Sequence, residues 1–169
     1  MLLPDYRSVA VDITEADITE AEYSQLYCLW IELESWSAEL AAQNYPKEES
    51  PGLRDIVVQL KETPENRIGD VLRREIQLHE MIWHFSGNAF LRRVLHRVIR
   101  PHMESLMLGT KASKYSRRDI ISEEERLVEA ILARDGRVSR TICRDNLQRM
   151  WRDGLLAFRG TAQDTIARY

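Results

Sequence analysis

Little in this chain interrupts a regular backbone. Its 169 residues include only 7 glycines and 5 prolines, and these are the two residue types that most disfavour a helix interior. The two cysteines, Cys28 and Cys143, lie far apart and lack the CxxC spacing of a metal or redox site. Each is therefore predicted to be a small buried hydrophobic residue in a reducing compartment, and the composition indicates a helix-rich globular protein.

Long apolar runs and a charge excess of one sign are also missing. No apolar stretch approaches the ~20 residues that a membrane span needs, and the N-terminus lacks the pattern of a signal peptide. The chain is thus predicted to be cytoplasmic, with no membrane partner. Its formal net charge of −3 and pI near 5.9 argue against a nucleic-acid surface, which needs concentrated positive potential.

The commonest catalytic signatures are absent as well. The sequence has no GxGxxG, GxxxxGK[ST], GxSxG or HExxH, which excludes the usual nucleotide, hydrolase and zinc-protease motifs. No separate general base or nucleophile pair is visible either. The chain is therefore predicted not to be an enzyme.

What the sequence does contain is helical periodicity. Apolar residues recur at spacings of three and four, and Thr19 to Glu22 fits a capping box. Pro51 suits the first turn of a helix, whereas Pro101 should kink or divide the helix that contains it. Helices are predicted over about 20–44, 51–60, 68–85, 89–108, 122–132 and 138–156. We find no strand pairs, so the predicted fold is an all-α antiparallel helical bundle of about six or seven helices.

The most informative motif is Glu75-Ile-Gln-Leu-His79, followed by Ser86-Gly-Asn88. A carboxylate and an imidazole four residues apart project from one face of a helix, where together they can hold a small ligand or a metal ion. Asn88 is predicted to cap the next helix. A plainer interpretation stays open, in which His79 is a hydrogen-bonded core histidine and Glu75 a surface carboxylate. Glu34, on the first long helix, could face a central cavity, but most helical glutamates are exposed, and an exposed position is favoured.

Several segments together resemble the FCD domain, the ligand-sensing C-terminal half of many GntR-family (FadR-type) bacterial transcription regulators. The resemblance covers residues 20–156. The matching residues are Leu26-Tyr27 through Ile31, Leu33-Glu34, Ala38 and Leu40 to Ala42; the central motif with Leu91; Glu123-Glu124, Leu127, Glu129 to Ile131 and Asp135; and Asn146-Leu147.

The resemblance implies a helical bundle that forms a homodimer and binds a small effector, often a carboxylic or sugar acid, in a central cavity. Many members also hold a divalent metal ion through one Asp and three His. The corresponding positions here are Glu75, His79, Glu124 and Asn146, so only one histidine is kept. Glu124 is chosen over its two glutamate neighbours for this position, because that alignment also matches Ala130 and Ile131 to the family pattern.

These replacements change the expected chemistry. One imidazole with two carboxylates and an amide is a harder, oxygen-rich set, suited to Mn²⁺ or Mg²⁺ if it binds a metal at all. Two additional carboxylates would also repel an anionic effector unless a metal ion neutralised them. A structural dimer with a degenerate pocket, and a metal-dependent enzyme using Glu75, His79 and Glu124, remain alternatives.

The predicted organisation has three parts. Residues 1–19 form an N-terminal arm or linker with a brief extended segment at Val9 and Val11, residues 20–157 form the helical effector-binding and dimerisation domain, and residues 158–169 form a tail. DNA is expected to be contacted only through a winged helix-turn-helix that this chain lacks. The chain is then either the sensor half of a longer regulator or a free-standing sensor.

Overall fold

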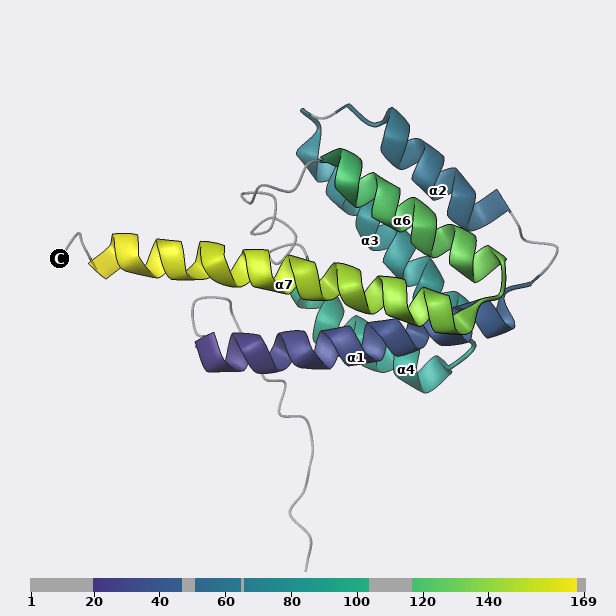
Figure 1. Ribbon diagram of the computed structural model, residues 1–169, viewed down its shortest axis with the longest axis horizontal. Coiled ribbons are helices and arrows are strands. Elements are labelled where there is room, and N and C mark those ends of the chain that lie inside the picture. The colour runs from purple at the N-terminus through teal and green to yellow at the C-terminus, as the bar shows by residue number, and fades with distance from the viewer. Residues whose placement is uncertain (1–19, 47–50, 65, 104–116, 167–169) are drawn as a thin grey trace, which may run out of the picture.

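The computed structural model describes residues 20–46, 51–64, 66–103 and 117–166, and regular structure in these ranges is entirely helical (Figure 1). The predicted all-α fold is thereby confirmed. The elements are α1 (Glu20–Asn44), α2 (Pro51–Glu62), α3 (Ile68–Phe85), α4 (Ala89–Val94), the π-helical turn η3 (Leu95–Ile99), α6 (Arg117–Leu132) and α7 (Gly136–Ile166).

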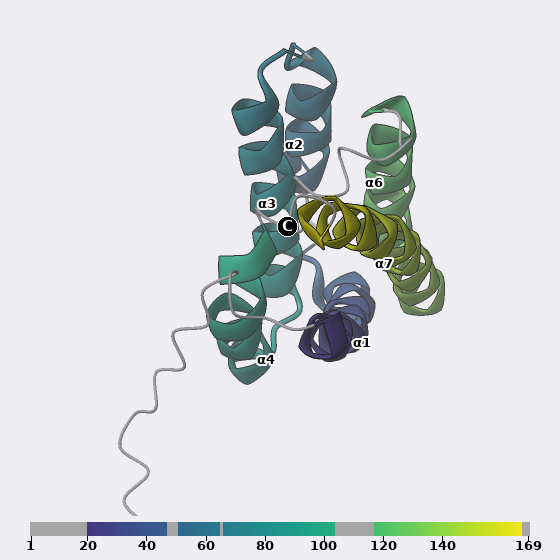
Figure 2. The same cartoon turned by 90° about the vertical axis from the view of Figure 1, so that its left-hand side faces the viewer.

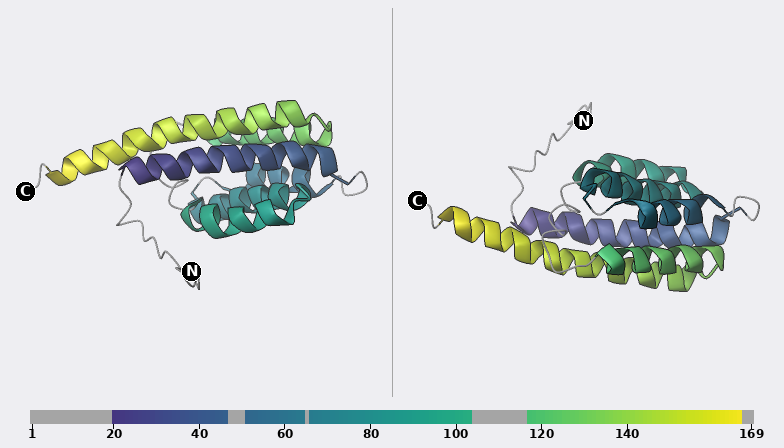
Figure 3. Two further views of the ribbon diagram at one scale, coloured as in Figure 1. Left: turned by 90° about the horizontal axis from the view of Figure 1, so that it is seen from below. Right: turned by 90° about the horizontal axis from the view of Figure 1, so that it is seen from above.

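The two longest helices, α1 and α7, lie side by side and antiparallel, and α7 projects past the N-terminal end of α1 (Figures 1 and 3). Helices α2 and α3 form a second antiparallel pair, which packs with α6 on one side of the long helices (Figure 2). The short α4 and η3 continue from α3 along α1. Helices α1, α3, α6 and α7 therefore enclose a common interior. No described helix is long and apolar enough to cross a membrane.

Small residues let α1 and α7 approach closely. Ala38 and Ala42 of α1 are fully buried. A Cβ atom added at Gly136 would lie only 3.1 Å from the carbonyl oxygen of Glu39. Larger side chains fill the interior beyond this contact, because apolar positions at helical spacing point the same way. The fully buried large residues are Trp30, Trp83, Tyr27, Leu53, Leu60, Leu78, Ile82, Leu95, Ile99, Met103, Leu127 and Ile131.

Several predicted details are wrong. Helix α6 begins at Arg117 and not at Ser122, because Ile121, which packs against the core, extends the apolar face of the helix beyond the serine. Helix α7 continues to Ile166, well past the predicted end near residue 156. Cys28 is exposed, whereas Cys143 is buried as predicted. The expectations for Val9, Val11 and Thr19, and for the end of the helix predicted at 89–108, lie outside the described residues.

The distortion expected near Pro101 takes the form of the π turn that precedes it. The N–H of Arg100 donates to the carbonyl of Leu95, five residues back. In a regular α-helix the ring of Pro101 would clash with the carbonyl four residues earlier, that of Arg97. A wider turn moves this carbonyl away from the ring, and π turns are among the known causes of helix distortion.

The junction between α3 and α4 is fixed by three neighbouring residues. Asn88 caps α4 as predicted, since its Oδ1 accepts from the N–H groups of Phe90 (3.2 Å) and Leu91 (3.0 Å). Gly87 has φ +69°, a left-handed conformation that favours glycine. Asn44, at the end of α1, donates through Nδ2 to the carbonyl of Ser86 at 2.8 Å. The predicted break after the central motif is therefore also where α1 is attached to α3.

The replacement Gly87→Ala is expected to destabilise the protein by about 2 kcal/mol. The left-handed backbone conformation costs an alanine about 1 kcal/mol or more, and its Cβ would lie 3.1 Å from Nδ2 of Asn44, which weakens a hydrogen bond worth about 1 kcal/mol. Gly69→Ala is the matched control, because its Cβ would meet nothing within 4 Å and helical alanine gains about 0.5–1 kcal/mol. Urea denaturation of both variants measures the difference, and equal effects would contradict this account of the junction.

Candidate functional site

All four residues predicted to form the site are buried. Glu75 and His79 lie on α3, Glu124 on α6 and Asn146 on α7, and their exposed fractions are 3%, 5%, 7% and 8%. Buried charged side chains are rare unless they are paired. The surface interpretation of Glu75 is therefore wrong, and the three charged residues face the bundle interior.

Glu34 of α1 joins this group, although an exposed position was favoured for it from the sequence. It is fully buried, and its Oε1 pairs with Nδ1 of His79. The indole N–H of Trp30 donates to Oε2, and the indole N–H of Trp83 donates to Oε1 at 3.3 Å. One periodic signal pointed to this position, because Glu34 follows Trp30 by four residues and precedes Ala41 by seven, on the apolar face of α1.

The other ring nitrogen of His79 faces α6. Its Nε2 lies 3.8 Å from Oε1 of Glu124, and Oε2 of Glu124 is buried with no hydrogen-bond partner. The neighbouring glutamates point elsewhere: Glu123 pairs with Arg149, and Glu125 pairs with Lys61 at the surface. Glu124 is thus the member of this acidic run that faces the interior. His79 lies between carboxylates from two different helices.

These contacts shift the pKa values of the group. Burial alone would lower the pKa of His79, but Glu34, Glu124 and Glu75 outweigh it and raise the value to about 9. Burial also raises the pKa of Glu124 to about 7, with help from Glu75 and Glu34 and against the opposing effect of His79. The imidazole is therefore positively charged at neutral pH, while Glu124 is a carboxyl group that gains a proton readily.

Cys143 of α7 belongs to the same interior. Burial, and the charges of Glu34 and Glu124, raise the pKa of its thiol well above the ordinary value. Since the thiolate is the nucleophilic form, a thiol held in this way is unreactive. Cys143 therefore acts as a packing residue.

Asn146 is buried on α7, and its described hydrogen bond goes to its own helix. Oδ1 accepts from Nη2 of Arg149 at 2.7 Å, and the same guanidinium pairs with Glu123. This chain of contacts ties α7 to α6 directly beside Glu124. Asn146 is thus linked through Arg149 to Glu123, the sequence neighbour of Glu124, with its amide oxygen already engaged.

The arrangement fits a metal ion in part. In the described ranges no three His, Cys, Asp or Glu side chains converge as a ready-made metal site. Nε2 of His79 nevertheless lies 3.8 Å from Oε1 of Glu124, and Oε2 of the same carboxylate is unpartnered. An imidazole nitrogen with carboxylate oxygens suits Mn²⁺, and purely oxygen-rich sets suit Mg²⁺. His79 and Glu124 would hold such an ion, and Glu75 and Asn146 would have to turn toward it.

A comparison with protein families gives one match. The model of the FCD domain matches residues 25–149, a range that contains Glu34, Glu75, His79, Glu124 and Asn146. The chain belongs to the FCD domain family. FCD is the effector-binding regulatory domain of GntR-type regulators and is not a known enzyme family. None of the curated proteins matches the chain.

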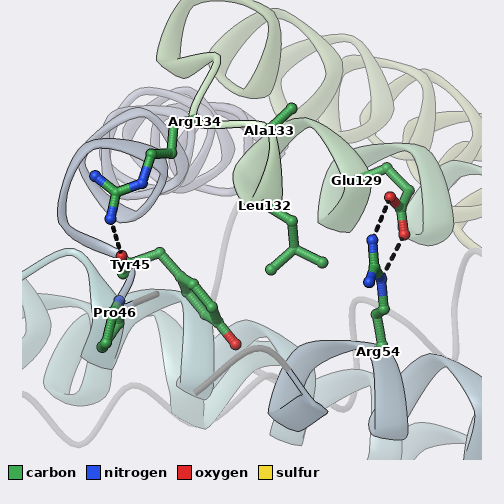
Figure 4. Close-up of a pocket in the computed structure, with 7 residues that line it drawn as sticks. All are labelled: Tyr45, Pro46, Arg54, Glu129, Leu132, Ala133 and Arg134. Carbon is green, nitrogen blue, oxygen red and sulfur yellow. Dashed lines mark hydrogen bonds and ion pairs between the residues drawn. The ribbon is translucent and has the colours of Figure 1, made fainter. Parts of the chain in front are cut away.

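The FCD chain also has a surface hollow of about 470 Å³ at the C-terminal end of α1, between α2 and α6 (Figure 4). Its two guanidinium groups are already engaged. Arg54 forms a two-pronged pair with Glu129 at 2.9 and 2.8 Å, and Arg134 donates to the carbonyl of Tyr45 at 2.6 Å. None of the four predicted site residues lines this hollow. The residues that line it are Tyr45, Pro46, Arg54, Glu129, Leu132, Ala133 and Arg134.

Proposed function

We propose that this FCD chain is the effector-sensing and dimerisation domain of a GntR-type bacterial transcription regulator. The observation that carries the proposal is the position of His79, between Glu34 of α1 and Glu124 of α6 in the interior of the bundle. A ligand bound at this point would contact three helices at once. It would therefore favour one packing of those helices over another.

The effector class we propose is a small carboxylic or sugar acid, bound together with a divalent ion. Three buried carboxylates, Glu34, Glu75 and Glu124, face a single imidazole, so an acid alone would meet net repulsion. A divalent ion supplies positive charge and open coordination positions for the oxygens of the acid. His79 and Glu124 would hold that ion, and Glu75 and Asn146 would complete the set of ligands.

The signal would be a shift of population. A ligand that binds one packing of the bundle more tightly increases the share of that packing. In a homodimer such a change would alter the spacing of two attached winged helix-turn-helix domains, to which we assign the contact with DNA. The bundle itself would perform no catalysis.

This proposal predicts stabilisation by ligand. Thermal unfolding with a panel of small carboxylates and sugar acids, with and without Mn²⁺, should show a higher Tm for at least one acid in the presence of Mn²⁺. At a concentration 100 times its Kd, a ligand stabilises by about 2.7 kcal/mol. For a domain of this size that corresponds to a rise of roughly 5–10 °C.

The variants Glu124→Gln and Glu125→Gln form a matched pair for this test. Glu124 is buried beside His79, whereas Glu125 is exposed and pairs with Lys61. The rise in Tm should shrink in the first variant and persist in the second. The absence of any rise across the panel, in the unsubstituted chain, would refute effector sensing through this site.

A structural dimer with a degenerate pocket is the second candidate. It is favoured by Glu34, because this side chain pairs with His79 and fills part of the polar interior from within the protein. A dimer that persists in analytical ultracentrifugation, combined with no response to acids or to Mn²⁺, would establish this alternative.

A further inference from the structure

Two indole N–H groups and Nδ1 of His79 converge on the single carboxylate of Glu34. The indoles are those of Trp30 and Trp83. Trp30 and Glu34 come from α1, while Trp83 and His79 come from α3. All four side chains are buried. The group therefore joins two helices through one acceptor.

The chemistry of the partners determines where the hydrogen of His79 lies. An indole nitrogen can only donate, and an ionised carboxylate can only accept. Nδ1 of His79 meets the same Oε1 that accepts from Trp83. A bare Nδ1 lone pair would repel that oxygen, so Nδ1 carries the hydrogen. In the neutral ring, the lone pair is then on Nε2.

We propose that Glu34 is a positioning residue that fixes the Nδ1–H form of the neutral His79 ring and directs the Nε2 lone pair of that form toward Glu124. The proposal rests on the proposed function for what Nε2 binds, a divalent ion or an ion with an acid. Metal-binding histidines are commonly oriented by a carboxylate on their second nitrogen, and loss of that carboxylate weakens metal binding about 10–100-fold. Glu34 of α1 would thus determine how tightly His79 of α3 binds its ligand.

Neither close analogue of glutamate can replace it. A glutamine amide offers one oxygen and one NH₂ group, so whichever way it turns, its NH₂ faces an indole N–H that needs an acceptor. An aspartate is one methylene shorter and cannot reach all three donors from the backbone of α1. Three converging donors therefore require the carboxylate at this length.

This requirement gives a sharp pair of variants. In Trp83→Phe, Glu34 still accepts from Trp30 and from Nδ1 of His79. In the double variant Trp83→Phe/Glu34→Gln, the amide oxygen can accept from Trp30 while the NH₂ group donates to Nδ1. That arrangement satisfies every remaining donor and moves the imidazole hydrogen to Nε2. The two proteins differ by one isosteric change. His79 should nevertheless be the Nδ1–H tautomer in the first and the Nε2–H tautomer in the second.

The first readout is the ¹⁵N NMR spectrum of labelled histidine, recorded above the pKa of His79, which is about 9 in the unsubstituted chain. We expect the Nδ1–H form in the unsubstituted chain and in Trp83→Phe, and the Nε2–H form in the double variant. Packing alone would not reverse the form of the ring. The Nε2–H form in the unsubstituted chain would overturn the proposal, and this spectrum needs no variant to fold.

The second readout is the affinity for Mn²⁺ measured by calorimetry. We expect binding to weaken about 10–100-fold in the double variant relative to Trp83→Phe. Equal affinities, with both variants shown to be folded by circular dichroism, would overturn the role of Glu34. If the unsubstituted chain binds no Mn²⁺ and no acid, the proposed function fails, and the NMR spectrum still decides whether Glu34 positions His79.

Discussion

Replacing Trp83 with alanine is expected to lower the free energy of unfolding by about 4 kcal/mol, the usual range for a fully buried tryptophan being about 3–5 kcal/mol. Trp83 has no exposed surface, and its ring packs edge-on against His96 with the centroids 5.2 Å apart. Its indole N–H also donates to Glu34. The variant would therefore lose apolar contacts and leave a cavity at the centre of the bundle. Urea denaturation followed by circular dichroism measures the loss.

Two further tryptophan variants separate packing from hydrogen bonding. Trp83→Phe retains most of the ring and removes the indole N–H, so we expect a loss of about 1–2 kcal/mol. Trp36 is 41% exposed, and Trp36→Ala should cost about 1 kcal/mol, because roughly half of the area is involved. If Trp36→Ala and Trp83→Ala were equally destabilising, the interior position of Trp83 would be refuted.

Raising the pH from about 5 to about 9 is expected to destabilise the protein, on the order of 5 kcal/mol in all. The pKa of Glu124 is about 7 in the folded protein, against an ordinary value of 4.5. The unfolded chain therefore releases this proton first, and stability falls between pH 4.5 and 7. The pKa of His79 is about 9, against 6.5. Its contribution to stability is complete below pH 6.5 and is lost as the pH rises through 9.

Stability falls with rising pH for both groups, and two variants separate the contribution of Glu124 from that of His79. Glu124→Gln should abolish the decline between pH 4.5 and 7, and His79→Gln should abolish the decline between pH 6.5 and 9. Asp70 and Glu129, whose pKa values are lowered by neighbouring arginines, affect stability at lower pH and in the opposite direction. Urea denaturation across this range provides the measurement. A stability that stays level or rises toward pH 9 would contradict the charge arrangement around His79.

The helices that could be predicted from the sequence are those whose limits are encoded locally. Pro51 begins α2 and the cap at Asn88 begins α4, as expected, because a proline or a capping side chain acts on its own turn. The start of α6 depends instead on the packing of Ile121 against the core, and no local signal marks the end of α7 at Ile166. Local pattern rules do not contain that information, and helix termini are the least reliable part of such predictions.

The candidate site could also be predicted only where the signal is local in sequence. The spacing of Glu75 and His79 predicted a shared helix face, and the register chosen at Glu124 coincides with the glutamate that lies inside. For Glu34, an exposed position was favoured over one facing a central cavity, because glutamate is usually exposed. Its burial depends on two donors of α3, Trp83 and His79, which are more than forty residues away in sequence. A tendency of one residue type cannot anticipate partners that only the fold supplies.

The π turn at Leu95–Ile99 changes the direction in which the side chains after it point, relative to those before it. Leu91, Leu95, Ile99 and Met103 are buried at intervals of four residues. At about 3.6 residues per turn, three such steps in a regular helix drift by roughly 120° around the axis, enough to carry Met103 off the common face. The π turn has more residues per turn, so it cancels part of this rotation. Deleting one residue from this turn would therefore rotate the residues that follow it. Either the contact of His96 with Trp83 or the burial of Met103 in the core would then be lost.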